Sequence, residues 1–283
     1  MNATGIPAQA VHEDVDRALS EDVGAGDRTA ALVPEAAMAR ATVLAREDAV
    51  VCGAPWFAEA FLRLDPQARV RWVVPEGGRV AAGGTVVEVQ GRARALLTAE
   101  RTALNFLQLL SGVATATARH VAAVEGTRAR ICDTRKTLPG LRLAQKYAVR
   151  AGGGTNHRMG LHDAILVKEN HIAAAGGVGP AVRAALAVAQ DAAFVEIEVE
   201  SLAQLEEALA AGAPMVLLDN MDLPTLREAV RITAGRAVLE ASGGVTLDRV
   251  RALALAGVDR ISVGALTKDV RAIDLSLRLE RLP

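Results

Sequence analysis

The spacing of apolar residues changes along the chain and predicts two regions of different architecture. The first ~110 residues mix helical and strand patterns, which predicts an α+β region. A strong helical pattern begins at Thr98, the expected cap, and runs to Leu110; another follows at 115–124, after an interruption at Ser111 and Gly112. The other elements expected here are a helix at 11–20 and strands at 39–46, 70–74 and 86–90.

From about residue 130, short apolar runs alternate with helical patterns. This repetition implies a parallel sheet, as a barrel or doubly wound. The ends of successive expected strands are mostly separated by a little over twenty residues, and this spacing favours a barrel. Six strands are visible against the eight of a closed barrel, so either two lie hidden within 136–160 or the barrel is incomplete. The expected strands are 129–134, 164–168, 193–199, 215–220, 237–242 and 260–264, and the helices 181–189, 202–211, 223–232 and 247–255.

Every expected strand of this second region ends in polar residues or glycine. Ligands bind at the carboxyl ends of strands in such folds, so we expect a site there. Glycines before two of the helices can bring backbone N–H groups close to phosphates. The residues at these ends are Asp133, Thr134, Arg135 and Lys136; Lys168; Glu196, Glu198 and Glu200; Asp219 and Asn220; Glu240, Ser242, Gly243 and Gly244; and Ser262 and Gly264.

Three acids alternate along the third of these strands and therefore point to one face. Like charges at this spacing repel one another unless cations or hydroxyls lie opposite them. We expect Glu196 to be structural, in a buried ion pair. We expect Glu198, nearer the open end, to meet a ligand hydroxyl or a metal-bound water.

A group of cations is expected to face these acids and glycines. So many positive charges predict a polyanionic ligand, because guanidinium groups suit planar carboxylates and lysine suits phosphate. Lysine occurs only at positions 136, 146, 168 and 268, and a retained lysine can do what arginine cannot. The cations are Arg135, Lys136, His157, Arg158 and Lys168, with Arg101 on the earlier helix.

Bulk composition argues against several classes of function. The formal net charge is -1 and aromatic residues make up 2%, which disfavours nucleic-acid binding and base stacking. We see no signal peptide and no apolar run long enough to span a membrane. Two cysteines, Cys52 and Cys132, are too few for a disulfide framework, so a cytoplasmic location is expected.

The histidines do not have the spacing of a transition-metal site. A Mg²⁺ ion carried by a diphosphate and held through Glu198, Asp219 and waters is more plausible, with no direct protein ligand. No Gly-x-Gly-x-x-Gly motif follows the first strand, so a dinucleotide-binding fold is unsupported.

Ordered sequence blocks over nearly the whole chain resemble the quinolinate phosphoribosyltransferase family (nicotinate-nucleotide pyrophosphorylase, carboxylating). Asp133-Thr134-Arg135-Lys136-Thr137-Leu138-Pro139-Gly140 is the most specific block. Others are 21–29, 99–105, 111–115, 146–149, 152–158, 166–171, 196–200, 218–220, 240–244 and 263–267. Ala241 stands where a serine is common in the family.

The resemblance implies a fold, a reaction and roles for residues. The fold is an N-terminal α+β sandwich and dimerisation domain, 1–111, and a C-terminal open, incomplete α/β barrel, 112–283. The reaction joins quinolinate to phosphoribosyl pyrophosphate with loss of CO2, giving nicotinate mononucleotide in NAD biosynthesis. A homodimer is implied, with Arg101 reaching the partner's site, possibly within a higher oligomer. By resemblance, Arg101, Arg135, His157, Arg158 and Lys168 hold the carboxylates, Lys136, Ser242, Gly243, Gly244 and Gly264 lie along the phosphates, and Glu198 and Asp219 address the ribose and magnesium.

Three alternatives stay open at this point. One is a Schiff-base aldolase of the barrel type with Lys168 as nucleophile, which the dense arginine cluster disfavours. Another is a related phosphoribosyltransferase acting on a different ring. The third is a non-catalytic nucleotide-binding module. For the quinolinate reaction we expect Lys168, Glu198 and Asp219 to be catalytic, with Lys168 nearest the carboxylate that is lost.

Overall fold

The computed structural model describes residues 5–282, and these form two compact units. One unit holds the described residues up to Ala116 together with those from Val270 onward, and the other spans Thr117–Asp269. None of the described helices is long and apolar enough to cross a membrane.

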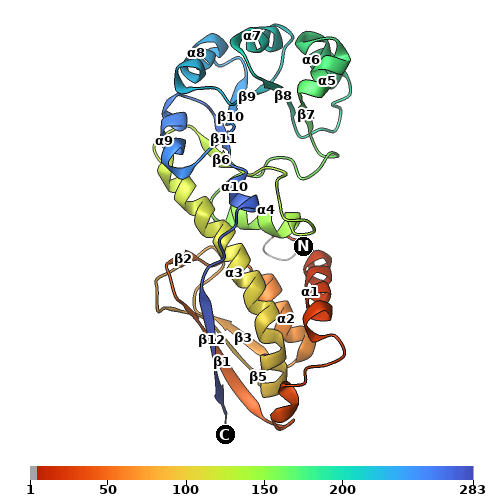
Figure 1. Ribbon diagram of the computed structural model, residues 1–283, viewed down its shortest axis with the longest axis vertical. Helices are drawn as coiled ribbons and strands as arrows, with labels where there is room; N and C mark the ends of the chain where they lie inside the picture. Colours follow the sequence, from red (N-terminus) through yellow and green to blue (C-terminus); the bar gives the residue numbers. More distant parts are fainter. Residues whose placement is uncertain (1–4, 283) are drawn as a thin grey trace. The chain divides into compact units, whose positions relative to one another are not determined.

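The first unit is built on an antiparallel sheet of four strands in the order β12-β1-β5-β3 (Figure 1). One face of β1 is fully buried at alternate residues from Ala39 to Ala45, as the two-residue period of a strand requires. Phe57 of α2 contacts Trp72 of β3 edge-on, with ring centroids 5.4 Å apart. The elements of this unit are α1 (Ala8–Val23), a 3-10 turn (Ala30–Leu32), β1 (Met38–Ala45), β2 (Ala49–Val50), α2 (Ala54–Leu64), β3 (Arg69–Trp72), β4 (Arg79–Val80), β5 (Thr85–Arg92), most of α3 (Ala93–Ala123) and β12 (Leu275–Arg281).

Helix α3 is continuous, and the interruption expected at Ser111 and Gly112 is wrong. Ser111 is buried and its hydroxyl accepts a hydrogen bond from the N–H of Cys52 at 3.0 Å. A Cβ at Gly112 would collide with the backbone oxygen of Arg271. Both residues therefore serve close packing inside the helix. Thr98 also lies inside α3, where its hydroxyl donates to Asp27 at 2.8 Å, so it is no cap.

The second unit contains a parallel sheet of six strands in the order β6-β11-β10-β9-β8-β7, with helices following the strands (Figure 1). Strands β6 and β7 are its two edges, so the sheet is open and the expected incomplete barrel is confirmed. The elements are β6 (Arg130–Cys132), α4 (Arg142–Ala151), β7 (Ile165–Val167), α5 (Glu169–Ala175), α6 (Val178–Ala187), β8 (Val195–Val199), α7 (Leu202–Ala210), β9 (Met215–Asp219), α8 (Leu223–Thr233), β10 (Val238–Ser242), α9 (Leu247–Leu255), β11 (Arg260–Ser262) and α10 (Ala265–Lys268).

The described segment 136–160 contains no strand of the sheet, so the two further strands that a closed barrel would need are not hidden there. It contains α4 and a single bridge from Thr155 to Cys132 on the outer side of β6. Helix α4 escaped the sequence reading because its buried positions include Gln145 and Lys146, which do not look like a core.

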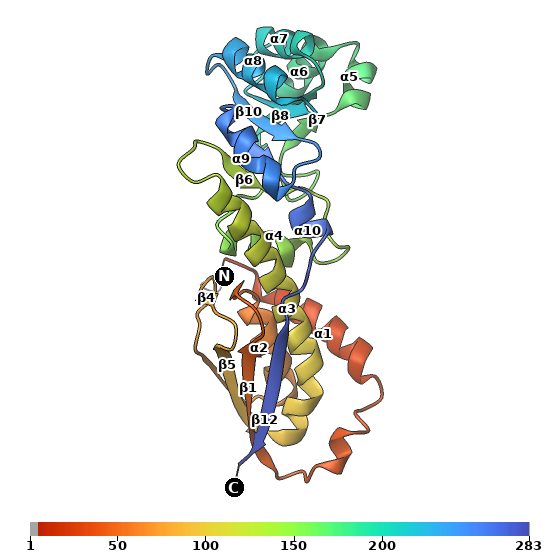
Figure 2. The ribbon, with the colours of Figure 1, turned by 60° about the vertical axis from the view of Figure 1, so that its left-hand side comes forward.

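The spacing of apolar residues along the chain does not show where the chain leaves the first unit and where it returns to it. The expected domains were 1–111 and 112–283, whereas the contacts divide the chain inside α3, after Ala116, and again at Val270. Strand β12 pairs with β1 in seven register positions, from Leu275 opposite Ala45 to Arg281 opposite Ala39 (Figure 2). This pairing spans most of the sequence, so only the folded chain reveals it.

Candidate functional site

A cavity of about 330 Å³ lies at the carboxyl ends of the strands of the second unit. Alternation along the strands places its walls, because residues two apart share a face. Leu166 therefore shares a face with Lys168, and Glu240 shares a face with Ser242. The lining residues are Thr134, Arg135, Lys136, His157, Arg158, Leu166, Lys168, Glu198, Leu217, Glu240, Ser242 and Ser262.

Most of the residues expected from the sequence meet in this cavity. They are Arg135, Lys136, His157, Arg158, Lys168, Glu198 and Ser242. Asp219 pairs with Ser242 in the sheet register, and Gly243 and Gly244 follow directly. Gly264 lies against Lys136, whose Cδ would be 3.1 Å from an added Cβ. Arg101 is an exposed residue of α3 within the first unit.

Two arginines bring unsatisfied N–H groups to the cavity. Among the described residues, the Nε atoms of Arg135 and Arg158 are buried without a hydrogen-bond partner. Burial and the neighbouring charge of Arg135 lower the pKa of Arg158. Two cations held close together with unpaired donors make a site that a planar anion would stabilise.

A buried ion pair fixes the segment that carries His157 and Arg158. Lys146 of α4 contacts Asp133 at the end of β6, and both side chains are almost fully buried. Lys146 Nζ also donates to the backbone oxygen of His157 at 2.9 Å. Asp133 accepts from the N–H of His157 at 2.9 Å and from Asn156 Nδ2 at 2.5 Å. The backbone before Arg158 is thus held on both its donor and its acceptor side.

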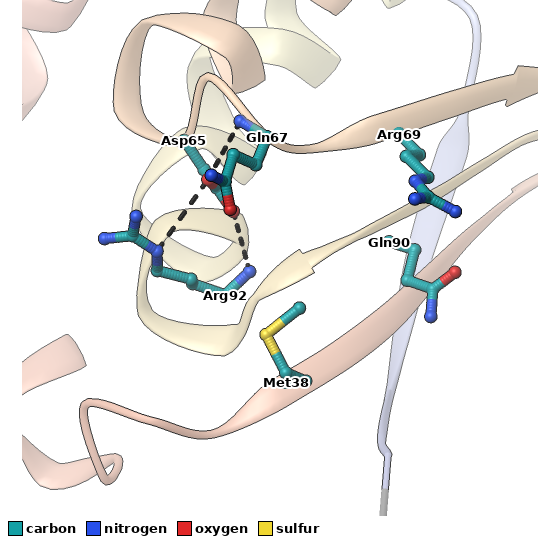
Figure 3. A pocket seen from close by; sticks show the side chains of 6 residues that line it. All are labelled: Met38, Asp65, Gln67, Arg69, Gln90 and Arg92. Carbon is teal, nitrogen blue, oxygen red and sulfur yellow. Dashed lines mark hydrogen bonds and ion pairs between the residues drawn. The ribbon is translucent and has the colours of Figure 1, made fainter.

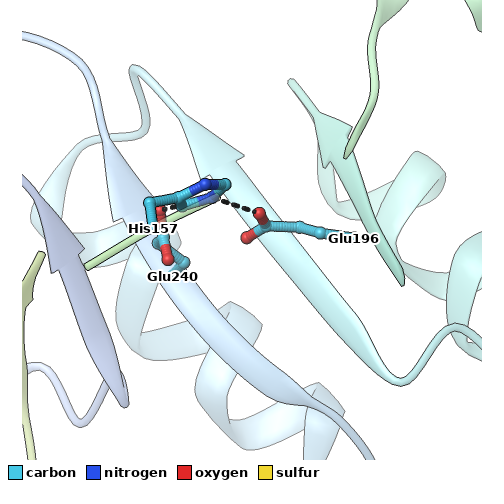
Figure 4. A group of neighbouring side chains, drawn as sticks. All are labelled: His157, Glu196 and Glu240. Atoms are coloured by element: carbon cyan, nitrogen blue, oxygen red, sulfur yellow. Dashed lines mark hydrogen bonds and ion pairs between the residues drawn. The ribbon is translucent and has the colours of Figure 1, made fainter. Parts of the chain in front are cut away.

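Both ring nitrogens of His157 are engaged within the protein. Nδ1 accepts the backbone N–H of Arg158 at 2.8 Å, so the ring proton belongs on Nε2. Nε2 lies 2.8 Å from Glu196 Oε2 and 3.7 Å from Glu240 Oε1 (Figure 4). Burial lowers the pKa of His157, so the ring is neutral. Both ring nitrogens of His157 therefore contact groups of the protein, whereas the resemblance implied that the ring holds a substrate carboxylate.

Glu196 and Glu240 form a fully buried acid pair on the cavity floor. Burial raises the pKa of each to about 7. Arg260 Nε lies 2.7 Å from Glu240 Oε2, an ion contact without hydrogen-bond geometry, and the guanidinium sits 5.8 Å from the Phe194 ring centroid.

One ligand atom from each of His157, Glu196 and Glu240 lies within 4.8 Å of the others, a spacing a metal could use. We do not read it as a metal site, because Arg260 supplies positive charge and the Nε2 proton of His157 fills the space between the acids.

The cavity rim carries a second acid–base contact. Lys168 Nζ lies 2.6 Å from Glu198 Oε2, and the lysine side chain is about half exposed. Glu198 thus lies two residues after Glu196 on the same face of β8, as the alternation predicted, and it contacts a cation. Glu200 lies beyond the end of β8 and is exposed.

The glycine turn after β10 has a steric reason. Gly243 has φ +95°, and a Cβ there would collide with the Asn220 side chain. The N–H of Asn220 donates to the oxygen of Ser242 at 3.0 Å, and its side-chain amide donates to Asp219 at 2.7 Å. The turn therefore requires glycine, and it precedes the nine-residue helix α9.

The sequence reading missed the apolar walls and one buried cation. Leu166 and Leu217 line the cavity two residues before Lys168 and Asp219, so the alternation rule could have found them. Arg260 gave no usable signal, because a charged residue in a strand reads as exposed.

A second cavity, of about 480 Å³, lies in the first unit (Figure 3). Its one acid, Asp65, is buried and accepts backbone N–H groups from Gln67 and Arg92. Its other lining residues are Met38, Arg69 and Gln90. With its carboxylate held in this way, the cavity offers no acid–base pair and is a poor candidate for chemistry.

Comparison with known proteins gives a consistent result. Residues 27–111 match the family model for the quinolinate phosphoribosyl transferase N-terminal domain, and residues 113–278 match that for the C-terminal domain. The chain is 45% identical to nicotinate-nucleotide pyrophosphorylase [carboxylating] of Mycobacterium leprae, covering 95% of this chain and 97% of that protein. It is 41% identical to quinolinate phosphoribosyltransferase [decarboxylating] 2a, mitochondrial, of Nicotiana tabacum, covering 93% and 80%. The solved nicotinate-nucleotide pyrophosphorylase from Francisella tularensis aligns with TM-score 0.95 and 43% identity over 98% of both chains.

Proposed function

The chain belongs to the quinolinate phosphoribosyltransferase family, and we propose that it transfers phosphoribosyl from phosphoribosyl pyrophosphate to quinolinate with decarboxylation. The products are nicotinate mononucleotide, pyrophosphate and CO2, a step of NAD biosynthesis. The observation that carries the proposal is the meeting of Arg135, Arg158 and Lys168 around one cavity, with two guanidinium Nε atoms still unpaired.

The ring dicarboxylate is recognised by the cations that line the cavity. Arg135 and Arg158 offer forked donors to planar carboxylates, and Lys168 adds a point charge. His157 acts indirectly, since its nitrogens hold Arg158 and Glu196. The apolar walls Leu166 and Leu217 suit a flat ring.

The phosphates lie on the other side, along Lys136 and the glycine turns at Ser242, Gly243, Gly244 and Gly264. Gly243 and Gly244 carry no side chain and precede helix α9, so backbone N–H groups there can meet a phosphate. Glu198 and Asp219 address the ribose hydroxyls. Their oxygens, reached through waters, also suit a magnesium ion bound to the diphosphate, which would neutralise charge on the leaving group.

The chemistry follows from this arrangement. The pyridine nitrogen attacks the anomeric carbon as pyrophosphate leaves, and Glu198 near the ribose favours the positive charge that develops there. The quaternised ring then loses its 2-carboxylate, because the positive charge of the ring nitrogen stabilises the electron pair that remains on the neighbouring carbon. Exclusion of water by the cavity walls favours this loss.

Assembly and location complete the proposal. We include a homodimer in which Arg101 of one protomer enters the partner's site, and a cytoplasmic enzyme. Two buried free thiols, Cys52 and Cys132, support a reducing compartment. An aldolase that uses Lys168 as nucleophile is disfavoured, since its amine is held in an ion pair with Glu198.

The test is turnover of quinolinate and phosphoribosyl pyrophosphate with magnesium, measuring nicotinate mononucleotide, pyrophosphate and CO2 in equal amounts. Lys168→Ala should lower the rate by about 100-fold or more. Lys268→Ala is the matched control, because that lysine is similarly exposed and pairs with Asp269 on the same unit. Full turnover by Lys168→Ala would exclude Lys168 from the reaction, and absence of product from the unaltered protein would refute the function.

A further inference from the structure

The floor of the cavity holds more negative charge than its cations can balance. Glu196 and Glu240 are both fully buried, Arg260 supplies one positive charge, and His157 is neutral. An unpaired carboxylate at this depth is costly, so the group takes up a proton. Asp133 and Lys146 lie nearby but balance each other.

Ser262 and Glu240 both line the cavity and contact each other. The contact joins the Ser262 hydroxyl to Glu240 Oε1. A hydroxyl both donates and accepts. When Glu240 is a carboxylate, Ser262 donates to it. When Glu240 is protonated, its proton can point to Ser262 Oγ, which leaves the serine proton directed into the cavity.

The proposed reaction needs a proton at this place. When the 2-carboxylate leaves as CO2, the carbon–carbon bond breaks and its electron pair remains on ring carbon 2. That carbon must gain a proton to give nicotinate mononucleotide.

We propose that Ser262 delivers this proton to carbon 2 and that Glu240 replaces it on Ser262. The inference rests on the proposed function. The serine proton forms the new C–H bond, the proton of Glu240 moves to Ser262 Oγ, and Glu240 becomes a carboxylate beside Arg260. Solvent restores its proton when the product leaves and the cavity opens to water.

Other candidates fit this task less well. Guanidinium groups such as Arg135 do not release protons in proteins. His157 directs its Nε2 proton at Glu196, below the cavity. Lys168 is the main rival, but its amine pairs with Glu198 at the rim.

The charged and titratable groups around Glu240 come from several elements. Burial raises the pKa of Glu240 to about 7, Glu196 adds to the rise, and His157 and Arg260 oppose it. Cys132 of β6 also lies near Glu240, and Asp133, directly after β6, lies near Cys132. Since the reaction needs protonated Glu240, product formation should fall as pH rises above about 7.

The experiment is a single turnover in which pyrophosphate release and nicotinate mononucleotide formation are timed separately. In Glu240→Gln, which keeps the shape but has no acidic proton, pyrophosphate should appear at the normal rate. Nicotinate mononucleotide should lag by about 100-fold, while the undecarboxylated mononucleotide accumulates. The fall of product formation above neutral pH should vanish. Ser262→Ala should show the same lag.

The control is Glu196→Gln, the same change on the other side of His157, without contact to Ser262. It should keep the two products in step, whatever its overall rate. The inference is overturned if Glu240→Gln and Ser262→Ala, shown to be folded by circular dichroism, form both products in step or release no pyrophosphate. Should Glu240→Gln fail to fold, Ser262→Ala decides alone. Absence of pyrophosphate from the unaltered protein would instead refute the proposed function.

Discussion

Replacement of Lys146 by methionine isolates the ion pair that holds the His157–Arg158 segment. Methionine fills similar space but leaves Asp133 buried without its cation. Removing one partner of a buried pair costs about 3–5 kcal/mol. Asp133 keeps two donors, the N–H of His157 and Asn156 Nδ2, so the lower end of this range, about 3 kcal/mol, is expected.

The loss of stability caused by Lys146→Met should depend on pH. Burial already raises the pKa of Asp133 in the folded protein, and the charge of Lys146 opposes that rise. Without Lys146 the pKa rises further. The folded variant then binds a proton that the unfolded chain does not, so its stability increases as pH falls. Compared with the unaltered protein, the deficit should be largest at pH 8 and smaller near pH 5.5.

The assay must report on the second unit. Both tryptophans, Trp56 and Trp72, belong to the first unit, so their fluorescence would miss the change. Hydrogen exchange of peptides from β6 and α4 is direct, and about 3 kcal/mol predicts roughly 100-fold faster exchange there. Arg71→Met is the control, because the exposed Arg71–Glu88 pair should contribute less than about 1 kcal/mol. Unchanged exchange at pH 8, or a deficit that does not shrink in acid, would refute the reasoning.

Two further predictions concern the ligand. Gly243→Ala should raise KM for phosphoribosyl pyrophosphate at least about tenfold in steady-state kinetics, because its Cβ would displace Asn220 from the turn. Gly126→Ala, also at a positive φ but with open space around it, should leave KM unchanged; equal effects would count against the phosphate turn. If Arg101 acts across a dimer, mixing inactive Arg101→Ala and Lys168→Ala proteins under exchange should restore about a quarter of full activity, since half of random dimers regain one intact site. No recovery despite verified exchange would place both residues in one protomer.

The spacing of apolar residues along the chain predicted those helices and strands in which the spacing is regular. The parallel strands of the second unit and its helices α6 to α9 were found because a buried strand and an amphipathic helix each leave a repeated apolar signature. Helix α4 was missed because Lys146 is buried in an ion pair. The continuity of α3 was missed because Gly112 looked like a breaker while it serves packing. The partner of β12 was unpredictable locally, since its register depends on β1.

The site was predictable for a related reason. Carboxyl ends of parallel strands meet at one edge, so Arg135, Lys168 and Glu198 had to lie near one another once the strands were placed. What each side chain contacts did not follow. The sequence gives no sign that both nitrogens of His157 are used internally, because that depends on the loop geometry after Asn156.

Charge in this cavity is sorted by depth, and the sorting explains how one pocket can serve two kinds of step. Arg158 and Lys168 line the cavity, where they hold the carboxylates of a dianion in the proposed reaction. One layer below, Glu196 and Glu240 would repel that same ligand if both were charged. Arg260 opposes this repulsion, and burial raises the pKa of both acids to about 7, which favours a proton on one of them. The floor is therefore neutral enough to accept a carboxylate above it, yet acidic enough to return a proton once that carboxylate has gone.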